Sequence, residues 1–369
     1  MAKKAKPHRM ARPTQDHPLR SVGIDHKNNN EEQRMNKLCS SLLLTTAIGL
    51  VAPATTMAAG SISICSVSGC SETASPWGWS RYADTRYPIV LAHGMAGFSR
   101  VGPLDYWYQI PQDLARNGAD VFITQVASFE SSEVRGEQLL QQVEDILAIT
   151  GADRVNLIGH SHGSHSIRYV AGVAPELVAS ATAIGGPNTG SPVADLVDDL
   201  RTSEVGEALE LGPVLSSVLN GFFGLVGLLS GEAYEQDALA GLASLTTEGA
   251  ADFNARFPAG MPALNDPCGQ GAAETNGVRY YSWSGTRTLT NVADVSDYAL
   301  SLTGLAFNGE ANDGLVGRCS SHLGTVIRDN YRMNHLDEVN QMIGLTYLFE
   351  TNPKSVFRIH ANRLKQAGL

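Results

Sequence analysis

The chain has 369 residues, of which 43% are hydrophobic, and a formal net charge of −10 at pH 7. This is enough apolar material for a sizeable core, in one large α/β domain or two ordinary domains. An acidic chain of this kind is a poor partner for nucleic acid, so we expect no nucleic-acid binding.

The first 59 residues are not expected to belong to the core. Residues 1–34 are basic, polar and without periodicity, which predicts a non-core extension and makes Met35 the expected true start. Residues 35–59 have the three parts of a secretory signal peptide, with an apolar run from Leu42 to Val51 that is too short to span a bilayer. No adjacent arginine pair precedes that run, so a twin-arginine leader fits less well. Loss of residues 1–59 would change the net charge to −15.

Four cysteines remain after the signal peptide, and an even number in an exported protein favours disulfides. Three pairings are possible, and we favour a short Cys65 to Cys70 loop together with a Cys268 to Cys319 bridge. A zinc site is the rival interpretation, but the spacings match no Cys/His ligand pattern.

The chain then reads as alternating strands and helices. Residues 60–86 are rich in Ser and Gly and predict a loosely ordered N-terminal arm, and the domain itself is expected over 87–369. Apolar runs at 88–92 and 121–126 predict buried strands, and apolar spacing over 133–149 predicts an amphipathic crossover helix. Strand, helix and strand in this order imply parallel pairing.

A strand from Val155 leads directly into Gly-x-Ser-x-Gly, with Gly159, Ser161 and Gly163. This pattern is typical of the sharp turn that projects a nucleophilic serine above an α/β-hydrolase sheet, where larger side chains would collide with the strand and helix. A Gly/Ser/His turn without chemistry is the alternative.

The second half of the chain is less regular. Strands are expected at 181–184 and 280–283, and 289–302 reads as an irregular segment that carries Asp294 and Asp297. Between Val205 and Leu245 the chain is strongly apolar. This stretch predicts either buried core helices or a mobile lid whose apolar face turns outward at a lipid surface.

A serine nucleophile needs a histidine base and a carboxylate that orients it, in the order Ser, acid, His. Asp313 lies in a tight Asn-Asp-Gly turn, and His335 follows in a polar segment, so we favour this pair over His322 and His360. The expected oxyanion donors are the backbone N–H groups of Met95 and His162.

Five stretches carry a family resemblance: YPIVLAHGM (87–95), SEVRGEQLL (132–140), VNLIGHSHG (155–163), NDGLVG (312–317) and RDNYRMNHLD (328–337). With these, the chain from about residue 87 onward resembles the Pseudomonas-type secreted true lipases, which are triacylglycerol hydrolases of the α/β-hydrolase fold. The resemblance implies a triad of Ser161, Asp313 and His335, oxyanion donors at Met95 and His162, and a Cys268 to Cys319 disulfide.

The resemblance also implies one structural calcium ion near the catalytic histidine. Its expected ligands are the carboxylates of Asp294 and Asp337 and the carbonyl oxygens of Gln341 and Leu345, and oxygen ligands suit calcium. Asp297 lies close to Asp294, and read without the family, the spacing of Asp337, Gln341 and Leu345 suggests one helix face. A lid at about 204–230, a dedicated foldase and export by the type II route are implied as well.

The sequence therefore predicts one mostly parallel α/β-hydrolase domain, with a helical lid, in a secreted triacylglycerol lipase that acts at lipid–water interfaces without membrane insertion. Residues 1–34 and the Cys65/Cys70 pair are departures from the family, as is the Gly163-Ser164-His165 continuation. A short-chain carboxylesterase or thioesterase is the nearest rival, and a non-catalytic binding module is the rival from another class.

Overall fold

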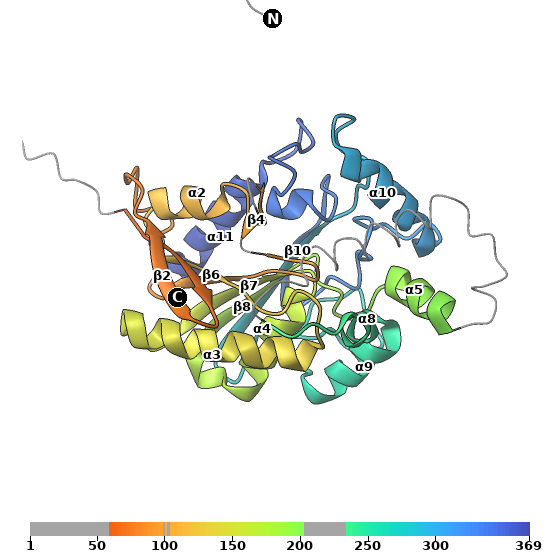
Figure 1. Cartoon of the computed structure of the whole chain (residues 1–369), viewed down its shortest axis with the longest axis horizontal. Helices are drawn as coiled ribbons and strands as arrows, with labels where there is room; N and C mark the ends of the chain where they lie inside the picture. The colour runs from red at the N-terminus through yellow and green to blue at the C-terminus, as the bar shows by residue number, and fades with distance from the viewer. Residues whose placement is uncertain (1–58, 99, 102–103, 203–233) are drawn as a thin grey trace, which may run out of the picture. The chain divides into compact units, whose positions relative to one another are not determined.

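The computed structural model describes residues 59–98, 100–101, 104–202 and 234–369 (Figure 1). The predicted extension at 1–34, nearly all of the predicted signal peptide and the predicted lid at 204–230 fall outside the described residues. All described residues belong to one unit, Thr56–Leu369.

A nine-stranded, mostly parallel sheet forms the centre of the described part of the chain, in the order β11-β10-β8-β7-β3-β6-β1-β2 with β9 beside β10. Only β2 and β9 pair antiparallel with their neighbours. The strands are β1 (Ile62–Ser66), β2 (Gly69–Ala74), β3 (Ile89–Ala92), β6 (Val121–Thr124), β7 (Val155–His160), β8 (Val178–Ile184), β9 (Glu274–Thr275), β10 (Val278–Gly285) and β11 (Thr325–Tyr331). A separate two-stranded pair joins β4 (Arg100–Val101) to β5 (Leu104–Asp105).

Helices cover both faces of the sheet (Figure 1). On one face lie α2 (Ile110–Arg116) and α11 (Pro353–Gln366), and on the other lie α3 (Ser132–Thr150) and α4 (Gly163–Val173). The side chains of β3 alternate between these layers: Ile89 and Leu91 belong to the core with α2 and α11, and Val90 and Ala92 to the core with α3 and α4. A strand buried on both faces explains why this run is apolar throughout.

The sheet begins earlier in the chain than the sequence predicts. Instead of a loose arm, β1 and β2 form a hairpin across a Gly69 turn, and β1 pairs with β6. Ile62 is buried, and the disulfide Cys65–Cys70 joins the two strands. The prediction of a loose arm is wrong because a single parallel strand with a disulfide-linked partner needs few apolar residues to extend an existing sheet.

The remaining helices follow β8 and β10 in the sequence. They are α5 (Pro192–Thr202), α8 (Ala238–Leu245), α9 (Thr247–Arg256) and α10 (Val295–Thr303), with 3-10 turns η1 (Pro175–Leu177), η2 (Gly304–Phe307) and η3 (Asp337–Val339). The segment predicted to be irregular therefore contains α10, which the Asp294 side chain caps. Conversely, the helix face suggested by the spacing of Asp337, Gln341 and Leu345 is absent, because Asn340 (φ 59°) ends η3 in a left-handed conformation.

The predicted fold class is confirmed: a mostly parallel sheet with helices on both faces and a βαβ core around β7. Within the described part of the chain, no helix has the length and apolar character required to cross a membrane. A second disulfide, Cys268–Cys319, links the segment before β9 to the segment before β11.

Candidate active site

Ser161 lies in the turn between β7 and α4, at the carboxyl end of a central strand. Its φ of 55° is in the left-handed region, which a residue with a side chain rarely adopts. The Ser161 N–H donates to the Ile184 carbonyl at 2.9 Å, and the Ser161 carbonyl accepts from the Ser164 N–H at 2.9 Å. The strained conformation is therefore fixed from the neighbouring strand and from the first turn of the helix.

Two glycines make this turn possible for steric reasons. A Cβ on Gly159 would lie 2.3 Å from the Gly163 carbonyl oxygen, and a Cβ on Gly163 would lie 2.3 Å from the Ala92 carbonyl oxygen. Both contacts are with backbone and cannot be relieved by a side-chain rotation. The structure thus supports the steric role that the sequence predicts for the two glycines.

Asp313 and His335 are in direct contact and buried. The Nδ1 of His335 lies 2.8 Å from Oδ2 of Asp313, and the His335 N–H donates to the Asp313 carbonyl at 3.0 Å. The other carboxylate oxygen, Oδ1, accepts from the N–H groups of Leu315 at 2.9 Å and Val316 at 2.7 Å. With Nδ1 bonded to a carboxylate, the Nε2 of His335 is the nitrogen that can accept a proton.

The loop after β3, residues 93–97 and here called the β3 loop, passes directly over the serine. A Cβ on Gly94 would lie 2.7 Å from Cβ and 3.1 Å from Oγ of Ser161. Arg135 of α3 is fully buried and donates to the carbonyl oxygens of His93 at 2.6 Å and Gly94 at 3.1 Å. With its main-chain carbonyls held by a guanidinium, the β3 loop has a fixed position relative to Ser161.

His162, whose N–H was predicted as an oxyanion donor, begins α4 as its N-cap. The first N–H groups of a helix have no acceptor within the helix and can donate to a ligand. Its ring is buried: Nε2 lies 2.9 Å from Oγ of Ser132, and the same hydroxyl lies 2.9 Å from Nδ1 of His165. Burial, together with the positive charge of Arg135, keeps the pKa of His162 well below its usual value, so the ring is neutral.

A second carboxyl group, Glu338, lies beside the Asp313 side chain. A Cβ on Gly185 would lie 2.1 Å from Oε2 of Glu338 and 3.1 Å from Oδ2 of Asp313. Glu338 is fully buried, and its Oε1 accepts from the Gly285 N–H at 2.5 Å. Burial first, and then the negative charge of Asp313, raise the pKa of Glu338 well above its usual value. Glu338 therefore holds its proton more tightly than an ordinary glutamate does.

Three further buried acids lie close to the His335 segment: Asp294, Asp297 and Asp337. Asp297 is satisfied by main-chain and side-chain donors, because its Oδ2 accepts from the Asn291 N–H at 2.6 Å and its Oδ1 from Nδ2 of Asn334 at 2.5 Å. Asp294 differs: Oδ1 caps α10, but Oδ2 is buried without a hydrogen-bond partner among the described residues.

The charges of these acids are not balanced. Burial, followed by repulsion from Asp297 and Asp294, raises the pKa of Asp337 to about 7. The carbonyl groups of Gln341 and Leu345 lie in the turns after η3, and the Gln341 carbonyl accepts from the Ile343 N–H at 2.7 Å. An unpaired buried carboxylate oxygen beside a second buried acid is a chemical environment that suits a hard cation.

A different group has metal-ligand spacing in the described part of the chain: His160, His335 and Glu338 have ligand atoms within 4.8 Å of one another. The Nε2 of His160 already bonds to the His335 carbonyl at 2.9 Å, and Nδ1 of His335 to Asp313. Both nitrogens of His160 are used in hydrogen bonds, Nε2 to the His335 carbonyl and Nδ1 to Oη of Tyr106 at 2.6 Å. We therefore assign this group to the hydrogen-bond network of the site and not to a metal.

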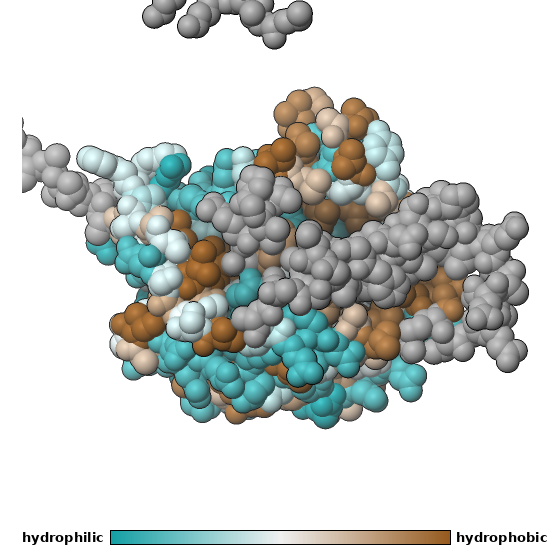
Figure 2. All heavy atoms as spheres, viewed as in Figure 1, coloured by the Kyte–Doolittle hydropathy of each residue, from teal (hydrophilic) through white to brown (hydrophobic). Residues whose placement is uncertain are grey.

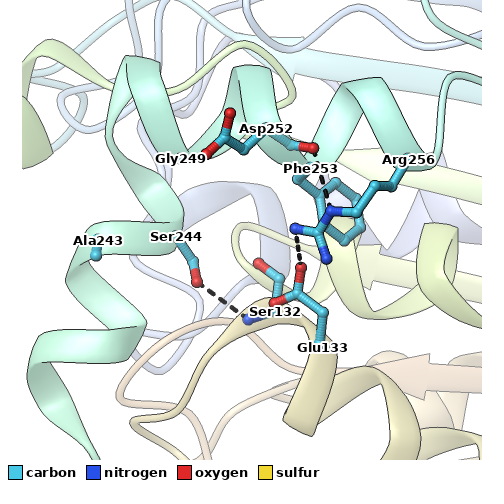
Figure 3. Close-up of a pocket in the computed structure, with 8 residues that line it drawn as sticks. All are labelled: Ser132, Glu133, Ala243, Ser244, Gly249, Asp252, Phe253 and Arg256. Carbon is cyan, nitrogen blue, oxygen red and sulfur yellow. Dashed lines mark hydrogen bonds and ion pairs between the residues drawn. The ribbon is translucent and has the colours of Figure 1, made fainter.

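A cavity of about 180 Å³ lies between α3, α8 and α9 (Figure 3). Arg256 forms an ion pair there with Glu133, and the Ser132 N–H donates to Oγ of Ser244 at 3.1 Å. Neither Ser161 nor His335 lines this cavity, so it is not the space in which a substrate would meet the serine.

Sequence reasoning missed four side chains of this site: Arg135, Tyr106, His160 and Glu338. Arg135 lies in a stretch quoted for the family resemblance, and His160 inside the Gly-x-Ser-x-Gly motif. The only available signal was the residue type, because a charged or polar residue within an otherwise apolar helix or strand face needs a buried partner. That signal does not identify the partner.

Comparisons with known proteins identify the fold and the family of the chain. A family profile described as alpha/beta hydrolase fold matches residues 87–338. A triacylglycerol lipase of Vibrio cholerae is 57% identical over 290 residues, which cover 78% of this chain and 90% of that protein. A triacylglycerol lipase of Pseudomonas fragi is 43% identical over 296 residues, which cover 78% of this chain and 98% of that protein.

Among solved structures, the mature form of a Bacillus licheniformis lipase superposes with a TM-score of 0.52 at 18% identity, over 76% of this chain and 92% of that chain. This likeness concerns the fold alone. The extent and identity of the sequence matches go further and confirm the resemblance found in the sequence: the chain belongs to the bacterial triacylglycerol lipases of the α/β-hydrolase fold.

Proposed function

We propose that this chain is a secreted triacylglycerol lipase that hydrolyses long-chain acylglycerol esters at lipid–water interfaces through a Ser-His-Asp acyl-enzyme mechanism. The observation that carries the proposal is the buried contact between His335 and Asp313, at 2.8 Å, next to the strained turn at Ser161. The ring of His160, the residue before Ser161, lies 4.5 Å from that of His335 between centroids. The relatives named triacylglycerol lipase support the substrate class.

In the proposed mechanism, Oγ of Ser161 attacks the ester carbonyl carbon while Nε2 of His335 takes the hydroxyl proton. Asp313 holds the imidazole in the tautomer with Nδ1 protonated and stabilises the imidazolium. The C–O bond to the alcohol then breaks, and His335 returns the proton to the leaving alkoxide. Water, deprotonated by His335, then attacks the acyl carbon; the bond to Oγ of Ser161 breaks, His335 returns its proton to that oxygen, and the fatty acid is released.

Two backbone N–H groups are the proposed oxyanion donors, those of Met95 and His162. Met95 belongs to the β3 loop, whose carbonyls Arg135 holds, and His162 begins α4 directly after the nucleophile. Such preorganised donors stabilise the negative oxygen of the tetrahedral intermediate without moving during the reaction.

A structural calcium ion is part of the proposal. The carboxylates of Asp294 and Asp337 and the carbonyls of Gln341 and Leu345 would hold it, as hard oxygen ligands. The unpartnered Oδ2 of Asp294 and the raised pKa of Asp337 fit this role, and the well-bonded Asp297 fits it less well. Bound there, the ion would supply positive charge that fixes the segment carrying His335.

Exposed apolar side chains near the His335 segment support action at a lipid surface. They gather around α10 and the loop before α11 (Figure 2), and they are Val292, Val295, Tyr298, Leu305, Leu348 and Phe349. Apolar groups exposed together in this way favour a partner that is itself apolar. A lid over about residues 204–230, export through the predicted signal peptide by the type II route, and assistance by a dedicated foldase complete the proposal.

The test is the initial rate on a dispersed long-chain triglyceride and on a soluble short-chain ester, each measured across its solubility limit, with protein folded with and without a co-expressed foldase. We expect a sharp increase in rate once the triglyceride forms an interface. Saturation on the soluble ester without any response to the interface would keep the triad but assign the chain to the short-chain carboxylesterases.

A further inference from the structure

We infer that Tyr106 and His160 are positioning residues that join the β3 loop to the His335 segment by a buried chain of hydrogen bonds running in one direction. The inference rests on the proposed function, since positioning has meaning only if Ser161 and His335 react together. It adds two side chains that would act on the reaction through others and would not touch the substrate.

The proposed hydrogen-bond chain consists of three bonds. The Gly94 N–H donates to Oη of Tyr106 at 2.9 Å, Oη of Tyr106 lies 2.6 Å from Nδ1 of His160, and Nε2 of His160 lies 2.9 Å from the His335 carbonyl oxygen. The side chains of Tyr106 and His160 are at most 4% exposed, so water does not compete for these bonds.

The groups at the two ends fix the direction of every bond. A backbone N–H can only donate and a carbonyl oxygen can only accept. Nε2 of His160 must therefore carry the proton that it gives to the His335 carbonyl, which leaves Nδ1 as an acceptor. Tyr106 must then donate to Nδ1 and accept from Gly94, so each group makes the one donation and the one acceptance that its chemistry allows.

The hydrogen-bond chain connects three segments that are far apart in the sequence. Gly94 lies against the Ser161 side chain, His160 is the residue before Ser161, and His335 carries the proposed base. Rings pack along the same path: His160 lies 5.7 Å from Tyr106 and 4.5 Å from His335 between ring centroids. One network thus sets the distance between the oxyanion donors, the nucleophile and the base, on which an enzymatic rate depends steeply.

Burial keeps His160 and Tyr106 in the neutral forms that the hydrogen-bond chain requires. Desolvation, and then the charge of His335, hold the pKa of His160 well below its usual value, and burial raises the pKa of Tyr106 above the usual value for a phenol. A protonated His160 would carry hydrogens on both nitrogens and could not accept from Tyr106. The neutral ring is therefore the form that completes the chain.

The first test is Tyr106→Phe, compared with Tyr108→Phe, whose hydroxyl takes no part in the chain. Each variant is assayed on a soluble short-chain ester, with active sites counted by a phosphonate. We expect kcat per active site to fall about tenfold or more in Tyr106→Phe, because one buried hydrogen-bonding group is lost and two others lose their partner. KM should change little. Binding of a boronic acid, which forms a tetrahedral anion on the serine, should weaken by a similar factor.

Two substitutions of His160 separate the two ends of the chain. Asn can accept from Tyr106 near the Nδ1 position but cannot reach the His335 carbonyl, and Gln can reach that carbonyl at the cost of the Tyr106 contact. His160→Asn should therefore retain boronate affinity better than His160→Gln. A merely structural role would not produce this difference.

The inference is overturned if Tyr106→Phe lowers the melting temperature but leaves kcat per active site and boronate affinity as in Tyr108→Phe. It is also overturned if the two His160 variants have equal boronate affinity. Failure of the proposed function is a separate outcome: the wild-type protein would then neither hydrolyse the ester nor react with the phosphonate at Ser161.

Discussion

The two sides of the candidate active site are held by different forces. Around Ser161 the backbone is packed so closely that Gly159 and Gly163 have no space for a Cβ, and the histidine rings nearby are buried and neutral. Around His335 the neighbours are buried acids, among them Asp337 and Glu338, whose pKa values are raised.

This difference indicates that close packing and backbone hydrogen bonds fix the proposed nucleophile, whereas the segment of the proposed base lies among buried charges. A side chain in a strained turn needs neighbours that leave no alternative conformation. Buried carboxylates of like charge repel one another unless a proton or a cation intervenes. Changes in packing should therefore act most strongly on the serine side, and removal of calcium should act on the histidine side.

The largest expected effect is that of Ser161→Ala. Removal of the nucleophilic hydroxyl should reduce hydrolysis at least about a thousandfold, because binding and oxyanion stabilisation alone leave only residual catalysis. The fold and the calcium affinity should stay unchanged, which circular dichroism and a calcium titration would check. More than trace activity in this variant would move the nucleophile to another residue.

Gly163→Ala should break the serine side by packing. Its Cβ would lie 2.3 Å from a backbone oxygen, so we expect a loss of about 4 kcal/mol or more in the free energy of unfolding. Gly151→Ala is the matched control: Gly151 has a φ of 68° but open space around it, and the cost there should be about 1–2 kcal/mol. Equal losses in the two variants would refute the steric account, and urea unfolding would measure them.

Acid should destabilise the protein through its buried, neutral histidines. Burial lowers the pKa of His93, His165 and His360 to about 3, and that of His160 and His162 well below its usual value. In the unfolded chain these rings take up protons below the ordinary histidine pKa of about 6.5, while in the folded protein they do not. The free energy of unfolding should therefore fall as the pH falls from about 6.5 towards 3, by up to about a factor of ten in the equilibrium constant per pH unit for each histidine.

The raised pKa values of Asp337 and Glu338 act in the opposite direction, since the stability that they contribute is lost as the pH rises. Because only two such acids oppose five buried histidines, we still expect the free energy of unfolding to fall towards acid pH. Urea unfolding at pH 7, 6 and 5 without calcium, where Asp337 keeps this raised pKa, would test the net sign. Stability that is constant or increases towards pH 5 would contradict the account.

Chelation should weaken the histidine side by a smaller amount. At a calcium concentration about a hundred times the Kd, removal of the ion costs about 3 kcal/mol, which corresponds to a decrease of at least about 5 °C in melting temperature. This decrease should precede any loss of rate per active site. Asp294→Asn should remove the calcium response, and Asp145→Asn, at an exposed position on α3, should retain it. Inhibition by chelator at an unchanged melting temperature would argue against a structural ion.

The sequence predicts the parts of this molecule that depend on local pattern. The apolar run at 88–92, the helix over 133–149 and the strand before Ser161 are all present in the structure, because periodicity and a strand–glycine–helix junction are properties of neighbouring residues. The hairpin of β1 and β2 is not evident in the sequence, since it depends on pairing with β6. The helix α10 was missed although its start signal, the N-cap Asp294, is local.

The same distinction holds in the site. Asp313 and His335 can be chosen from the order of the chain and the turn that carries Asp313, but the sequence does not reveal that Glu338 approaches Asp313 across Gly185. Nor does it reveal that Tyr106 and His160 connect the β3 loop to His335. Contacts between residues far apart in the chain depend on the completed sheet, and no local pattern marks them.

The most direct test of the central claim is to label the protein with an organophosphonate and to map the modified residue by mass spectrometry. We predict one adduct per chain, on Ser161, with activity on triglyceride lost in proportion to labelling and no adduct in Ser161→Ala. A stoichiometric adduct on another serine, or full labelling of Ser161 with hydrolysis unchanged, would contradict the proposed mechanism.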